Sequence, residues 1–155
     1  MSNESTKKST NSLQLATFYL NDLLLGIRIE NVQEINRQLD CTIVPHAPDY
    51  VQGVVNLRGD VVTVLNPKVI LELDNTDIHK GSRNLIINSE GELIGLCVDR
   101  VSDILTIPKD QINEPPANLK GIDGRFFKGI HQLESEVLVL LNIDEIICST
   151  TAEFA

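Results

Sequence analysis

The cysteines are the most reactive side chains in this sequence, and their arrangement does not suggest covalent chemistry. They are three in number, lie far apart without a Cys-x-x-Cys pair, and are Cys41, Cys97 and Cys148. An odd count argues against a closed disulfide framework and is typical of a reducing compartment. Cys97 stands inside the apolar run Leu93–Val98, which favours a buried, inert thiol over a nucleophile.

Acid–base and metal chemistry are equally weakly supported. The histidines His46, His79 and His131 are separated in sequence, so we expect ordinary exposed imidazoles and no metal site. A carboxylate pair such as Glu34 and Asp99 could exchange protons, yet nothing places an electrophile or a base beside it. The sequence also lacks G-x-S-x-G, H-E-x-x-H, P-loop and Rossmann glycine patterns. We therefore expect a protein that is not an enzyme and has no cofactor.

Charge and composition restrict the partners. Asp and Glu number 22 against 13 Lys and Arg, and the formal net charge of -9 disfavours nucleic acid. The basic residues form no run, and no apolar stretch is long enough to span a bilayer. The polar N-terminus lacks the apolar core of a signal peptide. A cytoplasmic protein that contacts other proteins is the expectation.

The elements needed to position these residues are mainly strands. The chain is 42% hydrophobic but only 4% aromatic, so Val, Ile and Leu must fill the core, and they favour pleated strands. Residues 13–20 and 23–29 are apolar runs around Asn21-Asp22, which predicts a hairpin. Residues 31–37 have apolar spacing that predicts about two turns of helix. Pro67 is suited to open a second short helix over residues 67–73.

An internal duplication sets the predicted architecture. Residues 25–35 align without gaps on residues 94–104, and residues 50–70 align on residues 126–146, with a loop insertion between the two segments in the second copy. Each copy reads as about five short strands. This predicts an all-β protein of two small barrels that share an apolar seam about a pseudo-two-fold axis, with strand exchange between them left open. The expected limits are a disordered tail at 1–12, one domain at 13–148 and a flexible C-terminus at 149–155.

The two copies differ most at their second hairpin tips. The first reads Asn56-Leu57-Arg58-Gly59-Asp60, where Gly59 can take the positive φ of a tight turn and Arg58 is held out at the strand end. The second has Leu133-Glu134-Ser135-Glu136 in the equivalent place, so an acid replaces the cation. The two halves are therefore not expected to bind the same partner surface.

Four segments, GIRIENVQEI, GVVNLRGDVVTVL, GLCVDRVSDI and VLLNIDEII, resemble the CheW family of chemotaxis coupling proteins. The resemblance runs in order over roughly residues 13–148. It implies two five-stranded SH3-like barrels and an adaptor that binds both the cytoplasmic tip of a methyl-accepting receptor and the regulatory domain of the CheA histidine kinase. No catalysis is implied.

The resemblance also carries site residues onto this chain. The receptor-binding set that it implies is Val32, Glu34, Ile35, Gly53, Asn56, Leu57, Arg58, Val98, Asp99 and Val101. The kinase-binding set that it implies is Ile112, Asn113, Glu114, Pro115 and Ala117. Two departures from the family pattern are Thr63, where Pro is frequent, and Asn66-Pro67, which replaces an Asp-Leu pair. The alternatives are a scaffold of another receptor–kinase pathway, in motility or development, and a peptide-binding β-barrel unrelated to signalling.

Overall fold

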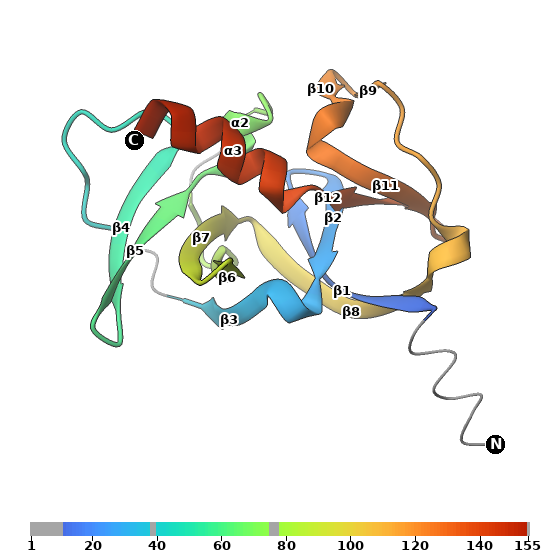
Figure 1. Cartoon of the computed structure of the whole chain (residues 1–155), viewed down its shortest axis with the longest axis horizontal. Helices are drawn as coiled ribbons and strands as arrows, with labels where there is room; N and C mark the ends of the chain where they lie inside the picture. The colour runs from blue at the N-terminus through green and yellow to red at the C-terminus, as the bar shows by residue number, and fades with distance from the viewer. Residues whose placement is uncertain (1–10, 38–39, 75–77, 155) are drawn as a thin grey trace.

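Two five-stranded sheets, each curled into a small barrel, make up most of the molecule (Figure 1). The computed structural model describes residues 11–37, 40–74 and 78–154, with side chains up to Thr150. The first barrel has the strand order β11-β12-β2-β1-β8 and the second has the order β3-β6-β7-β5-β4. A further small ladder pairs β9 with β10.

The first barrel is built from strands that lie far apart in the sequence. These are β1 (Ser12–Leu20), β2 (Leu23–Arg28), β8 (Arg100–Pro108), β11 (Phe127–Gln132) and β12 (Val137–Leu141). The second barrel contains β3 (Val32–Asn36), β4 (Val51–Leu57), β5 (Asp60–Leu65), β6 (Arg83–Ser89) and β7 (Glu92–Val98). The ladder strands are β9 (Asn118–Leu119) and β10 (Ile122–Asp123). Each barrel therefore combines strands from both copies of the duplicated sequence.

The strand pairing confirms the predicted pseudo-two-fold relation. Placing β4, β5, β7, β6 and β3 on β11, β12, β2, β1 and β8 reproduces one sheet order from the other. The single parallel pairing in each sheet also corresponds, β5 with β7 and β12 with β2. Register shifts fall just before the aligned glycines Gly53 and Gly129. The all-β, doubled-barrel fold class predicted from the sequence is thus confirmed.

The predicted first hairpin is confirmed, whereas the helix predicted next to it is wrong. β1 and β2 pair antiparallel around Asn21, which has a φ of 54°. Residues 31–37 instead form the end of a 3-10 turn, η1 (Ile29–Asn31), and strand β3. The spacing of Val32 and Ile35 fits a helix, but a segment as short as residues 31–37 cannot support an isolated helix, and the hydrogen bonds gained by pairing with β6 decide the outcome.

Two α-helices and two further 3-10 turns complete the described chain. α2 (Pro67–Ile70) begins as predicted with Pro67 in its first turn, and the Asn66 side chain accepts a hydrogen bond from the Lys68 backbone N–H. It is shorter than predicted because Glu72 takes a φ of 58°, which leaves the helical region. The 3-10 turns are η2 (Lys109–Gln111) and η3 (Gly124–Phe126).

The C-terminal helix α3 (Ile143–Phe154) links the barrels and runs past the expected domain limit at residue 148. It leaves β12 of the first barrel and ends over β4 of the second (Figure 1). The Tyr50 hydroxyl donates to the Thr150 carbonyl at 2.9 Å, and Thr150 is buried. Residues 149 and 150 are thus part of the packed structure. The tail expected at residues 1–12 lies, up to residue 10, outside the described residues.

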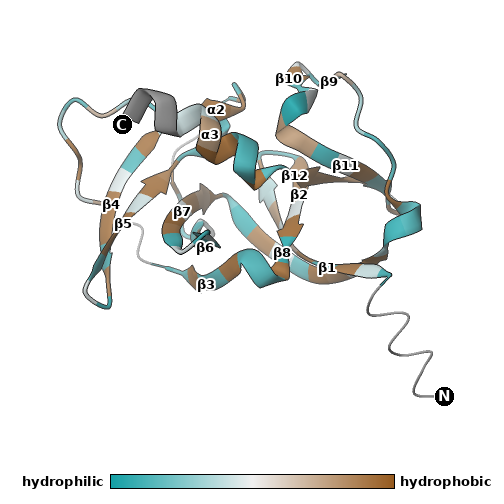
Figure 2. Ribbon diagram, in the orientation of Figure 1, coloured by the Kyte–Doolittle hydropathy of each residue, from teal (hydrophilic) through white to brown (hydrophobic). Residues whose placement is uncertain are grey.

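Three apolar clusters hold the fold together. The largest draws on both barrels and on α3, and we call it the shared core; it includes Phe18, Leu25, Leu85, Leu96 and Ile146. Smaller clusters fill each barrel, one around Leu15 and Leu138 and the other around Val62 and Ile86. Figure 2 shows hydrophobic colour along the strands and teal at the β4–β5 tip. Burial at about 25 cal/mol per Å² of apolar surface makes the shared core the main force that joins the barrels.

Within the part of the chain that the structure describes, no helix combines the length and the apolar character needed to cross a membrane.

Candidate partner-binding site

The β4–β5 tip presents Arg58 to solvent. Leu57 pairs with Asp60 across a two-residue turn in which Arg58 has a φ of 54° and Gly59 a φ of 91°. Two successive positive φ values give a turn that follows the natural twist of the strands. The Gly59 N–H donates to the Asn56 side-chain oxygen at 3.1 Å and fixes the turn. The Arg58 side chain is 76% exposed, so its guanidinium is available to a partner.

Glu34 joins this tip to the opposite edge of the second barrel. Its carboxylate on β3 lies 3.0 Å from the Arg58 guanidinium, although β3 and β4 are the two outer strands of the sheet. Glu34 is 20% exposed, whereas Arg58 is mostly solvated, so the pair is worth at most about 1 kcal/mol. The contact orients Arg58 rather than stabilising the barrel.

Exposed apolar residues neighbour the pair along strands β3 and β5. Ile35, which follows Glu34, is 48% exposed, and Val61, beside the tip, is 70% exposed. A guanidinium with apolar neighbours is the combination enriched at protein interfaces. Ile35 belongs to the implied receptor-binding set, but Val61 does not. Alternation of apolar residues along β5 is the signal that could have indicated an outward position for Val61, yet alternation alone does not separate a partner contact from a solvated one.

Three valines of the implied receptor-binding set contact the shared core. Val98 is buried, and Val32 and Val101 are partly buried against the same cluster. Val32 lies on β3 of the second barrel and Val101 on β8 of the first, so the implied set draws on both barrels. Val32 and Val101 each keep part of their surface exposed. Val98 is buried, so it can support a partner surface only through its neighbours.

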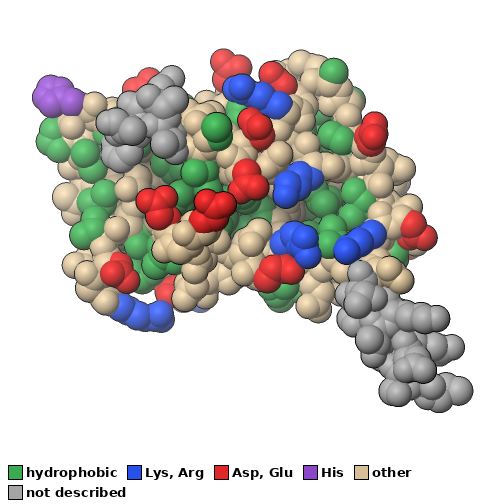
Figure 3. Space-filling model, in the orientation of Figure 1, with side chains coloured by type: hydrophobic (Ala, Val, Ile, Leu, Met, Phe, Trp, Pro, Cys, Tyr) green, Lys and Arg blue, Asp and Glu red, His purple; other side chains and the backbone are tan. Residues whose placement is uncertain are grey.

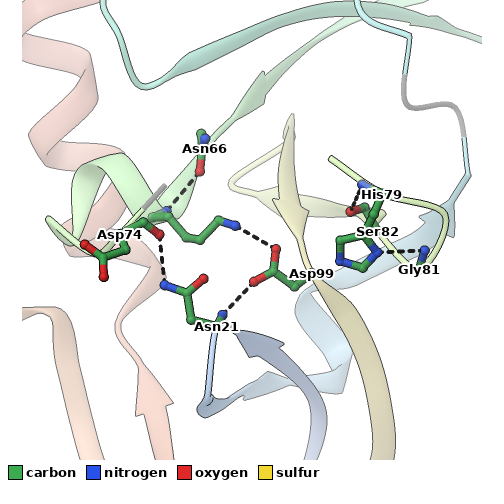
Figure 4. Close-up of polar contacts among 8 residues, drawn as sticks. Asn21, Asn66, Asp74, His79, Gly81, Ser82 and Asp99 are labelled. Carbon is green, nitrogen blue, oxygen red and sulfur yellow. Dashed lines mark hydrogen bonds and ion pairs between the residues drawn. The ribbon is translucent and has the colours of Figure 1, made fainter. Parts of the chain in front are cut away.

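Asp99 is engaged inside the protein. One carboxylate oxygen lies 2.7 Å from the Lys68 ammonium, and the other accepts the Asn21 backbone N–H at 2.6 Å (Figure 4). The Lys68 side chain is 5% exposed and that of Asp99 is 15% exposed. Asn21 also donates from its side chain to the Asp74 carbonyl at 2.9 Å. This network joins the β1–β2 turn of the first barrel to α2 beside the second.

Gly53 and Leu57 serve mainly as structural positions. Leu57 is buried in the cluster that fills the second barrel. A Cβ on Gly53 would come within 2.5 Å of the Cys41 Cβ and 2.7 Å of the Thr42 carbonyl oxygen. A Cβ on the aligned Gly129 would likewise come within 2.5 Å of the Ile112 side chain. Both glycines permit a neighbouring segment to pass closely over their strand, and neither offers a side chain to a partner.

The implied kinase-binding segment forms a loop on the first barrel. Asn113 exchanges two backbone hydrogen bonds with Ile130, of 2.8 and 2.9 Å, and the Ala117 carbonyl accepts from the Gly124 N–H at 2.8 Å. Ile112 packs against the cluster that fills this barrel. Between these anchors Glu114 is exposed and Pro115 half-buried. The kinase-binding set thus lies on the first barrel, whereas the receptor-binding set lies mainly on the second barrel and reaches the first at Val101.

The sequence alone did not identify Lys68 as a residue that interacts with the candidate site. It is a cation within the otherwise apolar stretch 67–71, and that contrast was the available signal. Its ion pair with Asp99 depends on two segments meeting in space, which spacing along the chain does not reveal.

Cys97 is buried, and burial raises the pKa of its thiol to about 11 from an ordinary value of 9.0. Burial also raises the pKa of Cys41, which is half-buried. Cys148 is exposed. A thiol with a raised pKa carries little thiolate near neutral pH and is a poor nucleophile.

We expect Cys97 to make the fold sensitive to alkali. The unfolded thiol ionises from about pH 9, while the folded thiol stays protonated up to about pH 11. The stabilisation is therefore complete below pH 9 and is lost as the pH rises to 11, amounting to about 2 to 3 kcal/mol. Urea unfolding of the protein and of Cys97→Ala at pH 8 and pH 10.5 measures it. The variant should lose less stability between the two pH values, and equal losses would contradict the assignment.

A doubled barrel in which strands of both halves cross over is the fold of a class of scaffold proteins. Residues 14–150 match the family model of the CheW-like domain. The chain is 29% identical over 140 residues to a chemotaxis protein CheW of Treponema pallidum, covering 88% of this chain and 82% of that protein. It is 31% identical over 99 residues to protein FrzA of Myxococcus xanthus, covering 64% and 62%.

A solved structure agrees with these sequence matches. It is the scaffolding protein TtCheW from Thermoanaerobacter tengcongensis, with a TM-score of 0.78, 28% identity, and coverage of 84% of this chain and 88% of that one. The chain belongs to the CheW-like family of chemotaxis scaffold proteins.

Proposed function

We propose that this protein is a cytoplasmic adaptor without enzymatic activity, which couples methyl-accepting chemoreceptors to a CheA-type histidine kinase. Membership of the CheW-like family supports the scaffold role. The observation that carries the receptor assignment is the exposed Arg58 tip, oriented by Glu34 and neighboured by exposed apolar residues. A guanidinium can form a bidentate bond with a carboxylate or bond to carbonyls on a receptor helix, while the apolar neighbours supply contact area.

The difference between the two barrels supports two partners rather than one. Arg58 of the second barrel corresponds to Glu134 of the first. A surface complementary to one tip meets a like charge at the other, which costs binding energy. We assign the receptor to the Arg58 side and the kinase regulatory domain to the loop at residues 112–117. By holding both partners together, the protein would pass the conformational preference of the receptor to the kinase, with a coupling free energy of about 1 to 3 kcal/mol.

A titration of the purified protein against both partners tests this proposal. A CheA-type regulatory domain and a receptor signalling fragment from the same organism should each bind, and should bind together, as measured by calorimetry and by co-elution in gel filtration. If the protein binds neither partner, it is not an adaptor of this kind. Binding of a regulatory domain from a motility or developmental kinase, with no binding of the chemotaxis pair, would move the protein to another receptor–kinase pathway.

A further inference from the structure

A hollow in the first barrel combines an apolar lining with a ring of cations. Its volume is about 300 Å³, and it lies between β1, β2, β12, the start of α3 and the segment after β8. Figure 3 shows blue side chains around a green hollow on this barrel. The apolar lining is formed by Leu13, Leu15, Ile27, Ile112, Leu140, Leu141 and Ile143. A volume of this size is at the lower end of the range for small-molecule sites.

Three cations border the hollow in a protein of net charge -9. They are Arg28, Lys109 and Lys128, and all three are exposed. Two acids lie nearby: Asp144 lines the hollow, and Glu30 lies 3.1 Å from the Arg28 guanidinium. A hydrogen bond from its own backbone N–H and the interaction with the neighbouring Arg28 both lower the pKa of Glu30. Its carboxylate is therefore charged at neutral pH. Three positive charges against two negative ones leave an excess of one positive charge.

The duplication provides an internal comparison for this site. In the second barrel, the positions aligned with Arg28 and Asp144 are Cys97 and Lys68. Both of these side chains are buried, and Lys68 is neutralised by Asp99. The position aligned with Lys128 is Gln52. One end of the duplicated fold is thus filled and internally paired, while the other is open and rimmed by cations.

An apolar hollow at the end of a small β-barrel, with one unmatched positive charge at its rim, is complementary to an amphipathic monoanion. We propose that this hollow binds a small carboxylate that carries a short apolar chain. The chain contacts Leu13 and Ile112, which are the partly exposed apolar residues of the lining, while the carboxylate lies among Arg28, Lys109 and Lys128. The hollow lies outside the Arg58 surface but shares Ile112 with the loop that we assign to the kinase. The inference does not rest on the adaptor function, because its test uses neither receptor nor kinase.

Three probes that share one tail and differ in their head group test the proposal. Octanoate, 1-octanol and octylammonium are titrated into the 15N-labelled full-length protein, and amide chemical shifts are followed. Octanoate should shift the amides of Gly26, Ile27 and Leu140 in a saturable manner. 1-Octanol should bind about tenfold more weakly because it lacks the charge, and octylammonium should leave these amides unchanged. Equal binding of all three probes, or shifts centred on another surface, would overturn the proposal.

Charge variants localise the anion. Replacing Lys109 and Lys128 together by Gln should weaken octanoate binding by about tenfold, because two exposed charge contacts are removed. Both side chains are exposed, so the fold should be retained. Lys120→Gln, at the exposed turn between β9 and β10, is the matched control and should bind octanoate like the parent protein. An unchanged affinity in the double variant would show that the cations do not hold the carboxylate.

Discussion

Replacing Arg58 with glutamate weakens binding of a receptor signalling fragment by about 30-fold, the effect of an interface hot spot worth about 2 kcal/mol. The side chain is 76% exposed and pairs with Glu34, so the variant replaces an ion pair by two neighbouring carboxylates. Like charges at that point repel each other and any acid of the partner. The affinity is measured by calorimetry with the purified fragment.

The same variant should fold normally. An exposed ion pair contributes at most about 1 kcal/mol, so the urea midpoint should change little. Arg125→Glu is the matched control, because it changes the net charge equally on an exposed arginine of the first barrel. It should bind the receptor fragment like the parent protein. If both variants lose affinity to the same extent, the effect comes from net charge, and the Arg58 tip is not the receptor site.

The fold could be predicted from the sequence because the duplication supplied long-range information. The aligned pairs Gly26 with Gly95 and Gly53 with Gly129 indicated that two segments far apart in the chain adopt one shape. The prediction that these segments are strands then followed from the abundance of β-branched residues. The misassigned segment at residues 31–37 shows where this reasoning stops. Its local spacing fits a helix, and the pairing with β6 that overrides it lies about fifty residues further along the chain.

The candidate site was predictable only in part. Arg58 could be identified because the turn around Gly59 is a local motif that places the intervening side chain in solvent. The role of Asp99 could not, since its partners Lys68 and Asn21 come from separate segments. The sequence alone does not distinguish a strand-end carboxylate that faces a partner from one that pairs with a buried ammonium. We therefore expect fewer positions to be available to a receptor than the resemblance implies.

Replacing Lys68 with methionine destabilises the protein by about 3 to 5 kcal/mol, the usual cost of leaving one member of a buried ion pair without its partner. The methionine retains much of the apolar stem, so the loss reports the Asp99 charge rather than a cavity. The Asn21 N–H still bonds to Asp99 but cannot neutralise it. Urea unfolding at pH 7 measures the difference, with Lys80→Met, an exposed lysine, as the control.

The double variant Lys68→Met with Asp99→Asn separates the orphaned charge from the lost contact. An asparagine can still accept the Asn21 N–H while carrying no charge, so the double variant should recover at least about 1 to 2 kcal/mol relative to Lys68→Met alone. Because the network ties the β1–β2 turn of the first barrel to α2 beside the second, the single variant should also raise amide exchange on both sides of the shared core. A double variant no more stable than Lys68→Met would mean that Lys68 acts through packing. In that case the Asp99 carboxylate would not need Lys68, and its Lys68-facing oxygen could serve a partner, as the resemblance implies.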